Sequence, residues 1–490
     1  PNVGKSSLLN AMLKEEKAIV TNIAGTTRDV VEGSVTVDGI LLNMIDTAGI
    51  RETDNIVESL GVEKSKEIIK KADLVLLVID GSKELDQEDQ KLLELTEDTN
   101  RIIIINKADL GKKVDLEGIE ISAKEQDILA NKCEWGDHNK QGEVEKIKAA
   151  TKYTFPGRGH KYSSFEWNWT HFTGIDVNSK TGEHAIFKFK DKTWRQAVDN
   201  EFANFDYLMG ADLDFSNREV IEECKRWGLW YQEFTRVDGF RLDAVKHIDS
   251  GFYKEWVQYL RAKTQKELFT VGEYWSYDVN KLNKYLADVD YVMSLFDVPL
   301  HANFYDASID TNYDMSQILA NTLITSNPMK AVTFVDNHDT QPNQALQSFI
   351  EPWFKQFAYS VILLRKDGYP CVFYGDLYGM PYANIPPVER IKTLLKLRKI
   401  KAYGRQHDYF DHKNVVGWTR EGDNMHLNSG LAVLMSNSFD AEKRMYVGTS
   451  FAGEKFIDCL DNCADVITID DSGCGVFKTK GRSCSVWVKI

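Results

Sequence analysis

Two separate sets of short motifs follow one another in this chain, and each set is typical of a different fold. Residues 1–124 contain, in order, PNVGKSS, GTTRD, DTAG, NKAD and ISAK. The later residues contain GFRLDAVKH, VGEYW and FVDNHD. The chain has 490 residues, and one hydrophobic core rarely serves more than about 250–300 residues. The order of the motifs therefore predicts at least two domains with separate cores.

Composition limits the partners and the location. The net charge of −14 argues against non-specific electrostatic binding of nucleic acid, which needs clustered Lys and Arg. No direct nucleic-acid patch is evident, although contact with RNA through a local patch stays open. No apolar run is long enough to span a bilayer, and no secretory signal opens the chain. We therefore expect a cytoplasmic protein with no membrane partner.

The cysteines do not suggest a disulfide framework. There are seven, an odd number, scattered from Cys133 to Cys484. Cys459 and Cys463 could be interpreted as metal ligands, but no second pair or His partner has zinc-like spacing. We expect free thiols in a reducing compartment.

Apolar runs in the first part of the chain predict an α/β sheet. They cover residues 41–46, 74–80 and 101–106. The last two are continuous runs of Leu and β-branched residues, as expected for parallel strands buried on both faces. Each run ends at a motif, which is where open α/β sheets bind ligands. The expected fold over 1–124 is a doubly wound, mostly parallel sheet.

The first motif has the form of a P-loop that closes into a helix. Backbone N–H groups would cradle phosphates, Lys5 would reach the β- and γ-phosphates, and Ser6 would hold Mg²⁺. The triplet Gly4-Lys5-Ser6 is a weak signal alone, because Gly-Lys-Ser is also a common turn. The first glycine of the full motif would lie before residue 1, so the chain starts inside the motif.

The later motifs make the prediction of a GTP-binding domain specific. Asp46 would contact Mg²⁺ and the γ-phosphate, Asp109 would accept the guanine N–H groups, and ISAK would close the base pocket. Four motifs in this order are very unlikely to be a coincidence. The predicted GTP-binding residues are Asn2, Gly4, Lys5, Ser6, Ser7, Thr26, Thr27, Asp46, Gly49, Asn106, Lys107, Asp109, Ser122, Ala123 and Lys124.

Residues 1 to about 124 resemble the G domain of the tRNA-modifying GTPases of the MnmE/TrmE family. The resemblance implies that GTTRD is switch I, with Thr27 as a Mg²⁺ ligand, and that Asn2 binds an activating K⁺ ion. It also implies that Glu58 positions the attacking water, although Glu58 could instead lie on a solvated helix face. In that family the G domain is inserted in a larger protein that modifies the tRNA wobble uridine. Neither flanking region is present, so only a possible tRNA-modification partner protein is implied.

In the rest of the chain, predicted strands end in acidic residues at regular intervals. These runs are 237–243, 268–273, 331–339 and 369–376, with helical stretches at 252–266 and 387–401. Carboxylates at the carboxyl ends of strands are what a (β/α)₈ barrel presents at its active site.

Two of these carboxylates could serve a retaining glycosidase, which needs a nucleophile and an acid/base about 5–5.5 Å apart. Asp243 and Glu273, on consecutive strands, could meet that geometry. Arg241 lies two residues before Asp243, on the same face, and its guanidinium would keep Asp243 ionised. Asp339, preceded by His338, could grip sugar hydroxyls. Each alone is more often a surface acid or a structural ion pair; together they are highly specific.

From about residue 133 to 490 the chain resembles the α-amylases of glycoside hydrolase family 13, in particular the bacterial liquefying type and its cytoplasmic relatives. This implies retaining endo-hydrolysis of α-1,4-glucosidic bonds in starch- or glycogen-like glucans. The implied roles are Asp243 as nucleophile, Glu273 as general acid/base, Asp339 as transition-state stabiliser, Arg241 and His338 as substrate contacts, and Lys246 and His247 on the aglycone side.

The resemblance also implies a domain order. Residues 125–215 would be a remnant of domain B, 216–399 would be barrel strands four to eight, and 400–490 would be an antiparallel β-sandwich. Nothing corresponds to the first three barrel strands, and no linker separates the two resemblances. A five-strand remnant is expected to leave open sheet edges and an exposed core, which favour aggregation.

A calcium site is implied only in part. Asp206 and Asp212 match calcium ligands of the family, and His247 would add its backbone carbonyl. Three other positions that are aspartate in secreted relatives are Thr173, Arg195 and Ser216. Calcium prefers six to eight oxygen ligands, and an arginine in the cluster is incompatible with a multi-ion site. We expect at most one calcium ion, weakly held.

Two questions stay open on sequence alone. A dense group of aromatic residues could be core or could stack on sugars; it comprises Phe165, Trp167, Trp169, Phe172, Trp194, Phe205 and Tyr207. The chain could be an α-amylase, a GTPase linked to tRNA modification, or an inactive or artefactual fusion of two truncated genes. We rank α-amylase first, because that resemblance covers most of the chain.

Overall fold

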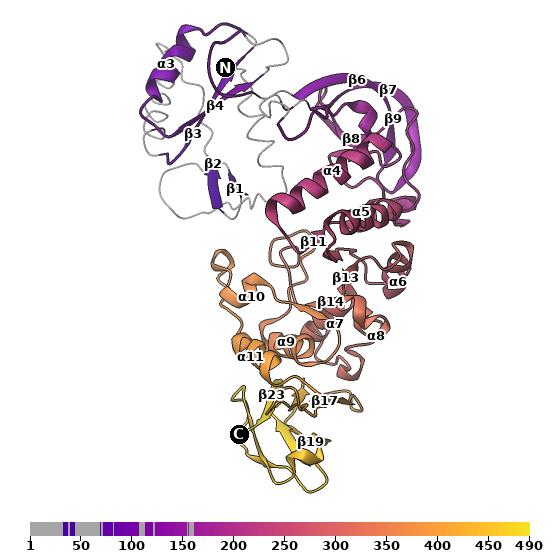
Figure 1. Ribbon diagram of the computed structural model, residues 1–490, viewed down its shortest axis with the longest axis vertical. Helices are drawn as coiled ribbons and strands as arrows, with labels where there is room; N and C mark the ends of the chain where they lie inside the picture. Colours follow the sequence, from indigo (N-terminus) through magenta and orange to yellow (C-terminus); the bar gives the residue numbers. More distant parts are fainter. Residues whose placement is uncertain are drawn as a thin grey trace. The chain divides into compact units, whose positions relative to one another are not determined.

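The computed structural model describes two compact units. It covers residues 33–37, 40–44, 69, 72–81, 83–106, 113–120, 123–153, 155 and 161–490. One unit comprises Pro1–Thr193 with Met209–Asp214, and the other comprises Trp194–Leu208 with Phe215–Ile490. Figure 1 shows the elements with labels where there is room, and its colours follow the sequence from indigo to yellow.

The first unit begins with short α/β elements. These are the antiparallel hairpin of β1 (Gly33–Val37) and β2 (Ile40–Met44), the parallel strands β3 (Val75–Asp80), β4 (Arg101–Asn106) and β5 (Ile119–Glu120), and helix α3 (Gln87–Leu95). Ile79 and Ile105 are fully buried in the core of the parallel strands. The predicted strands over 74–80 and 101–106 are therefore confirmed, as is their parallel pairing.

A separate antiparallel sheet follows in the same unit. Its order is β10-β8-β9-β6-β7, with β6 Ala123–Glu134, β7 Asp137–Tyr153, β8 Phe172–Asn178, β9 Glu183–Phe189 and β10 Ala211–Leu213. Ala123 and Lys124 pair with Tyr153 and Lys152. The last predicted nucleotide motif thus runs directly into the first strand of this sheet.

Burial answers part of the question about the aromatic residues. Phe172, Trp194 and Tyr207 are buried, whereas Trp169 is 40% exposed. The remaining three, Phe165, Trp167 and Phe205, are half-buried. For the three buried side chains the core interpretation is correct.

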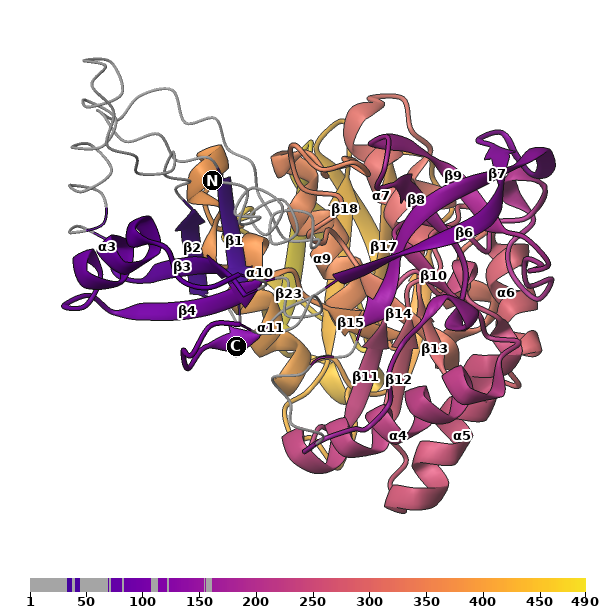
Figure 2. The same cartoon turned by 90° about the horizontal axis from the view of Figure 1, so that it is seen from above.

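The second unit contains a parallel sheet of five strands in the order β11-β12-β13-β14-β15. The strands are β11 Gly239–Leu242, β12 Phe269–Gly272, β13 Ser294–Phe296, β14 Ala331–Phe334 and β15 Tyr369–Cys371. The helices are α4 Arg218–Thr235, α5 Ser250–Thr264, α6 Val279–Asp288, α7 Val298–Ile309, α8 Leu323–Ser326, α9 Lys355–Leu364, α10 Tyr374–Tyr378 and α11 Ile391–Ile400. Figure 2 shows the five strands side by side.

The structure confirms four predicted strands of this sheet and adds β13, which has only three residues. The predicted helix over 252–266 is α5. The helix predicted from 387 begins later, at Ile391, because Arg390 before it has a left-handed backbone (φ 63°).

The sheet is an open part of a barrel wall. Within the described part of the chain, β11 pairs only with β12 and β15 only with β14. Phe269 and Tyr369 belong to strands that are not neighbours, yet their rings meet at 5.5 Å between centroids, so the sheet is curved. Both rings are exposed, by 47% and 43%. Among the described strands the predicted open edges are therefore present, and these two rings are exposed.

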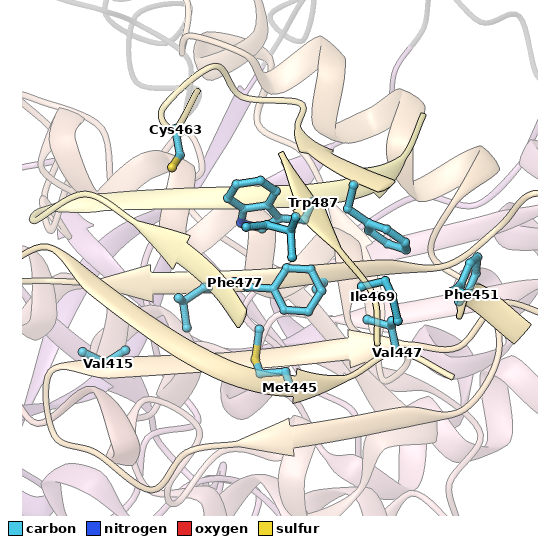
Figure 3. Close-up of a cluster of buried hydrophobic side chains, with 12 residues drawn as sticks. Val415, Met445, Val447, Phe451, Cys463, Ile469, Phe477 and Trp487 are labelled. Atoms are coloured by element: carbon cyan, nitrogen blue, oxygen red, sulfur yellow. The ribbon is translucent and has the colours of Figure 1, made fainter. Parts of the chain in front are cut away.

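The C-terminal part of the second unit is antiparallel, as predicted. One sheet has the order β16-β17-β18-β23-β20-β21, and β19 pairs separately with β22. Their bounds are β16 Gln406–Tyr409, β17 Val415–Arg420, β18 Leu431–Ser436, β19 Ala441–Tyr446, β20 Lys455–Asp458, β21 Ile467–Thr468, β22 Cys474–Thr479 and β23 Ser483–Lys489. Met445, Phe477 and Trp487 are fully buried in the shared core (Figure 3).

Two further features concern membrane spans and disulfides. In the portion of the chain that the structure describes, no helix is both long and apolar enough to cross a membrane. All seven cysteines are free thiols.

Candidate active site

The register of two parallel strands brings Asp243 and Glu273 together. Leu242 of β11 pairs with Gly272 of β12, so the next residue on each strand stands at the same carboxyl edge of the sheet. The Glu273 N–H donates to the Leu242 carbonyl at 2.9 Å, and the Val245 N–H donates to the Glu273 carbonyl at 2.9 Å. Hydrogen bonds between the two backbones thus continue the pairing of β11 with β12 past Asp243 and Glu273.

Glu273 is buried and held by a backbone donor. It is 7% exposed, and its Oε2 accepts the Ala244 N–H at 2.9 Å. Ala244 has a left-handed backbone, with φ 42°, which turns its N–H toward the neighbouring strand. Burial raises the pKa of the Glu273 carboxyl; the Ala244 N–H and the Arg241 charge lower it by less, and Asp339 raises it further. A carboxyl that keeps its proton suits a general acid.

Asp243 lies in a different environment from Glu273. Its side chain is 59% exposed and forms an ion pair with Arg241. The predicted pairing of Asp243 with Arg241 is therefore present. The two acids therefore differ as a glycosidase requires, since one is exposed beside a cation and the other is buried.

The third predicted acid, Asp339, lies on the loop after β14. The Asp339 N–H donates to Asn337 Oδ1 at 2.9 Å, and His338 Nε2 lies 3.3 Å from Asp339 Oδ2. The His338 and Asp339 side chains are 63% and 36% exposed. The structure thus brings the three predicted catalytic carboxylates to the carboxyl ends of β11, β12 and β14.

Lys246 and His247 follow on a single 3₁₀ turn, and both side chains bind other residues of the chain. Lys246 Nζ pairs with Glu201 Oε2 at 2.9 Å. His247 is buried, and its Nδ1 lies 2.9 Å from the Phe205 carbonyl. Burial lowers the pKa of His247 to about 4, so the ring is neutral near pH 7. Both side chains hold the segment 194–208 against the end of β11.

The residues expected to bind calcium belong to both units, and Asp206 has a partner within its own unit. The buried Asp206 carboxylate accepts the Arg195 N–H at 2.7 Å. The Arg195 guanidinium binds Asp249 Oδ2 at 2.8 Å through Nε, and Asp212 lies in β10 of the other unit. Among the residues that can be described, no group of three or more His, Cys, Asp or Glu could hold a metal ion.

Most of the predicted GTP site lies outside the described residues. This applies to Asn2, Gly4, Lys5, Ser6, Ser7, Thr26, Thr27, Asp46, Gly49, Glu58, Lys107, Asp109 and Ser122. Asn106 ends β4, and its carbonyl accepts the Gly81 N–H at 2.8 Å. Ala123 and Lys124 lie in β6.

Sequence reasoning missed a buried ion cluster behind the Asp339 loop. Asp376 ends one of the acidic runs, but it is 1% exposed, in α10, and is bound to Lys355 at 2.8 Å. Asp336 is the other partner of Lys355. The available signal in the sequence was Lys355, the one charged residue of the run 352–364. The other residues of that run are apolar or aromatic, except for Gln356 and Ser360.

Residues 143–422, more than half of the chain, match the family model for the alpha amylase catalytic domain. The chain belongs to the alpha-amylase family. Residues 431–488 match the alpha-amylase C-terminal model. Residues 1–107 match the model described as 50S ribosome-binding GTPase. This α-amylase family member therefore carries a GTPase domain in its first part, and both predicted resemblances are confirmed.

Curated relatives match the two parts separately. The alpha-amylase of Geobacillus stearothermophilus is 52% identical over 346 residues, covering 70% of this chain and 63% of that protein. The cytoplasmic alpha-amylase of Escherichia coli (strain K12) is 42% identical over 362 residues, covering 71% of this chain and 73% of that protein. The tRNA modification GTPase MnmE of Streptococcus pneumoniae (strain Hungary19A-6) is 59% identical over 129 residues, covering 26% of this chain and 27% of that protein. The chain thus spans only part of each relative's length.

Proposed function

We propose that this chain hydrolyses internal α-1,4-glucosidic bonds of starch- or glycogen-like glucans with retention of configuration. The observation that carries the proposal is the buried Glu273, whose pKa is raised by burial, beside the exposed Asp243 at the end of the neighbouring strand. The names and identities of the amylase relatives support the substrate class.

The proposed reaction has two steps. The Asp243 carboxylate attacks the anomeric carbon, the glycosidic C–O bond breaks, and Glu273 gives its proton to the departing oxygen. A water molecule then displaces Asp243 from the anomeric carbon, and its proton returns to the Glu273 carboxylate. Arg241 forms an ion pair with Asp243, while Asp339 and His338 would hold hydroxyl groups of the sugar at the cleaved bond.

Reducing-end release from soluble starch tests this function. We expect activity in the purified chain and a loss of at least about a hundredfold in Glu273→Gln and Asp243→Asn. Glu454→Gln, on the C-terminal domain, is the matched control and should keep full activity. A soluble, folded chain without glucan hydrolysis would contradict the proposal.

Domain division, location and metal content belong to the same proposal. We divide the chain into a G domain at 1–124, a domain B remnant at 125–215, barrel strands four to eight at 216–399 and a β-sandwich at 400–490. The name of the E. coli relative and the seven free thiols support a cytoplasmic location. The Arg195–Asp249 pair supports at most one weakly held calcium ion.

GTP binding and hydrolysis form a second proposed function. The family match over 1–107 and the parallel pairing of β3 with β4 support it. Ser6 and Thr27 would hold Mg²⁺, Asn2 would hold K⁺, and Glu58 would position water. The name of the MnmE relative supports a tRNA-modification partner protein for this domain.

GTP hydrolysis in K⁺ against Na⁺ buffer tests this second function, with Asp109→Asn as the variant that loses guanine recognition. We expect hydrolysis to be faster in K⁺ and to be lost in the variant. Absence of both activities from folded protein would instead support a fusion of two truncated genes.

A further inference from the structure

Three ionisable side chains are sealed inside the second unit next to the Asp339 loop. Lys355, Asp336 and Asp376 are each 2% exposed or less. Lys355 Nζ lies 2.8 and 3.0 Å from the two carboxylate oxygens of Asp376 and also pairs with Asp336 Oδ2. Lys355 opens α9, Asp376 lies in α10, and Asp336 follows β14. One ammonium group therefore joins three elements.

The remaining polar atoms of the cluster are satisfied by further hydrogen bonds. Tyr359 donates its hydroxyl to Asp376 at 2.6 Å, and Ile350 donates its N–H to Asp336 at 3.3 Å. Burying charges is expensive, and such a cluster is weak evidence for added stability. A buried pair does, however, fix the position of whatever its partners carry, so the elements attached to it matter most.

Asp336 connects the cluster to the loop that carries Asp339. Thr340 Oγ1 donates to Asp336 Oδ1 at 2.7 Å and accepts the Asn337 N–H at 2.9 Å. Asn337 Oδ1 in turn accepts the N–H groups of Asp339 and Thr340, both at 2.9 Å. Both ends of the segment 336–340 are thus tied to each other and, through Asp336, to Lys355.

We propose that Lys355 is a positioning residue for Asp339, acting through Asp336 and Thr340. The exposed end of the loop carries His338 and Asp339 toward the site, while the buried end is fixed by a charge in the core. The inference rests on the proposed function, in which Asp339 contacts the sugar at the cleaved bond.

Thr340→Val and Thr340→Ser test the connection with little change of volume. We expect Thr340→Val to lower kcat on starch about tenfold with KM within about twofold, and Thr340→Ser to restore most of kcat, because the two hydrogen bonds that the Thr340 hydroxyl forms with Asp336 and Asn337 are lost and regained. Lys355→Met should lower kcat in the same way. Lys284→Met, at an exposed ion pair on α6, is the control and should match the wild type.

Hydrogen–deuterium exchange of the unliganded full chain gives a readout that does not depend on activity. Amides 337–340 should exchange about tenfold faster in Thr340→Val and at the wild-type rate in Thr340→Ser. A folded Thr340→Val variant with wild-type exchange and wild-type kcat would overturn the inference. If the wild type hydrolyses no glucan, the proposed function fails, and exchange at these amides still decides the positioning role. If Lys355→Met does not fold, the Thr340 pair decides alone.

Discussion

Two buried carboxyl groups of the second unit, Glu273 and Asp336, have different surroundings. Burial raises the pKa of both Glu273 and Asp336. Glu273 stands at the carboxyl edge of the parallel sheet, beside the exposed Asp243. Asp336 is enclosed by Lys355, Asp376 and Thr340 and has no such exposed neighbour.

The pH dependence of stability should report the Asp336 proton. Burial raises the pKa of Asp336 from 3.8 to about 7. Between these values the folded protein binds a proton that the unfolded chain has released, so this contribution to stability is greatest at acid pH and is lost as pH rises toward 7. Asp336→Asn removes it, at most about 1.4 kcal/mol per pH unit.

The measurement is the thermal unfolding midpoint of wild type and Asp336→Asn at pH 5 and pH 7. The wild-type midpoint should fall more than that of the variant over this interval. Other groups that face the cluster, namely Lys355, Asp376, Tyr359 and His301, are shared by both proteins. Equal changes in the two proteins would show that Asp336 does not hold this proton.

At the scale of elements, fixed cations secure the segment 194–208 to the parallel sheet. The Arg195 guanidinium binds Asp249, which caps α5, and Lys281 Nζ binds Asp199 at 2.9 Å. The Asp199 N–H also donates to the Lys246 carbonyl at 2.9 Å. Protein side chains thus occupy the coordinating positions of the carboxylates Asp199 and Asp249.

Chelation should therefore have little effect on the second unit. We expect EDTA to leave the unfolding midpoint unchanged, whereas Arg195→Gln should lower the free energy of unfolding by about 1–3 kcal/mol, because Asp249 loses a charged hydrogen bond. Lys284→Gln, at an exposed ion pair with Asp288 within α6, is the control and should change stability much less. A midpoint that falls in EDTA and recovers with added Ca²⁺ would mean that an ion holds this segment.

The elements also show how far the sequence alone could lead. Acidic residues at the ends of apolar runs identified four strands and the three site carboxylates, because parallel strands carry such residues to one edge. Strand β13 was not predicted, because a run of three residues shows no periodicity. The Lys355 cluster was not predicted, because the two acidic partners of Lys355 are 19 and 21 residues away in sequence. The late start of α11 depends on the backbone of one residue, Arg390, which no pattern specified.

At the scale of the whole molecule, an unclosed sheet should favour association. β11 and β15 each offer an edge, and the exposed rings of Phe269 and Tyr369 lie on the inner face. Free edges beside exposed apolar side chains are templates for pairing with other chains. Such a chain is expected to form soluble oligomers before it precipitates.

Phe269→Lys tests this expectation. A charge on the inner face should raise the monomer fraction in size-exclusion chromatography with light scattering, because it opposes contact between exposed faces. Phe439→Lys, at an equally exposed ring on the C-terminal domain (49%), should leave the monomer fraction unchanged. A similar gain from both variants would point to net charge instead of the inner face.

The pairing of Leu242 with Gly272 has a consequence for how much of a barrel the chemistry needs. Adjacent strands lie about 4.8 Å apart, close to the roughly 5–5.5 Å that a retaining glycosidase needs between its acids. Backbone pairing of two neighbouring strands therefore suffices to place Asp243 and Glu273 side by side at one edge of the sheet. This placement depends on the pairing of β11 with β12 and does not need a closed barrel.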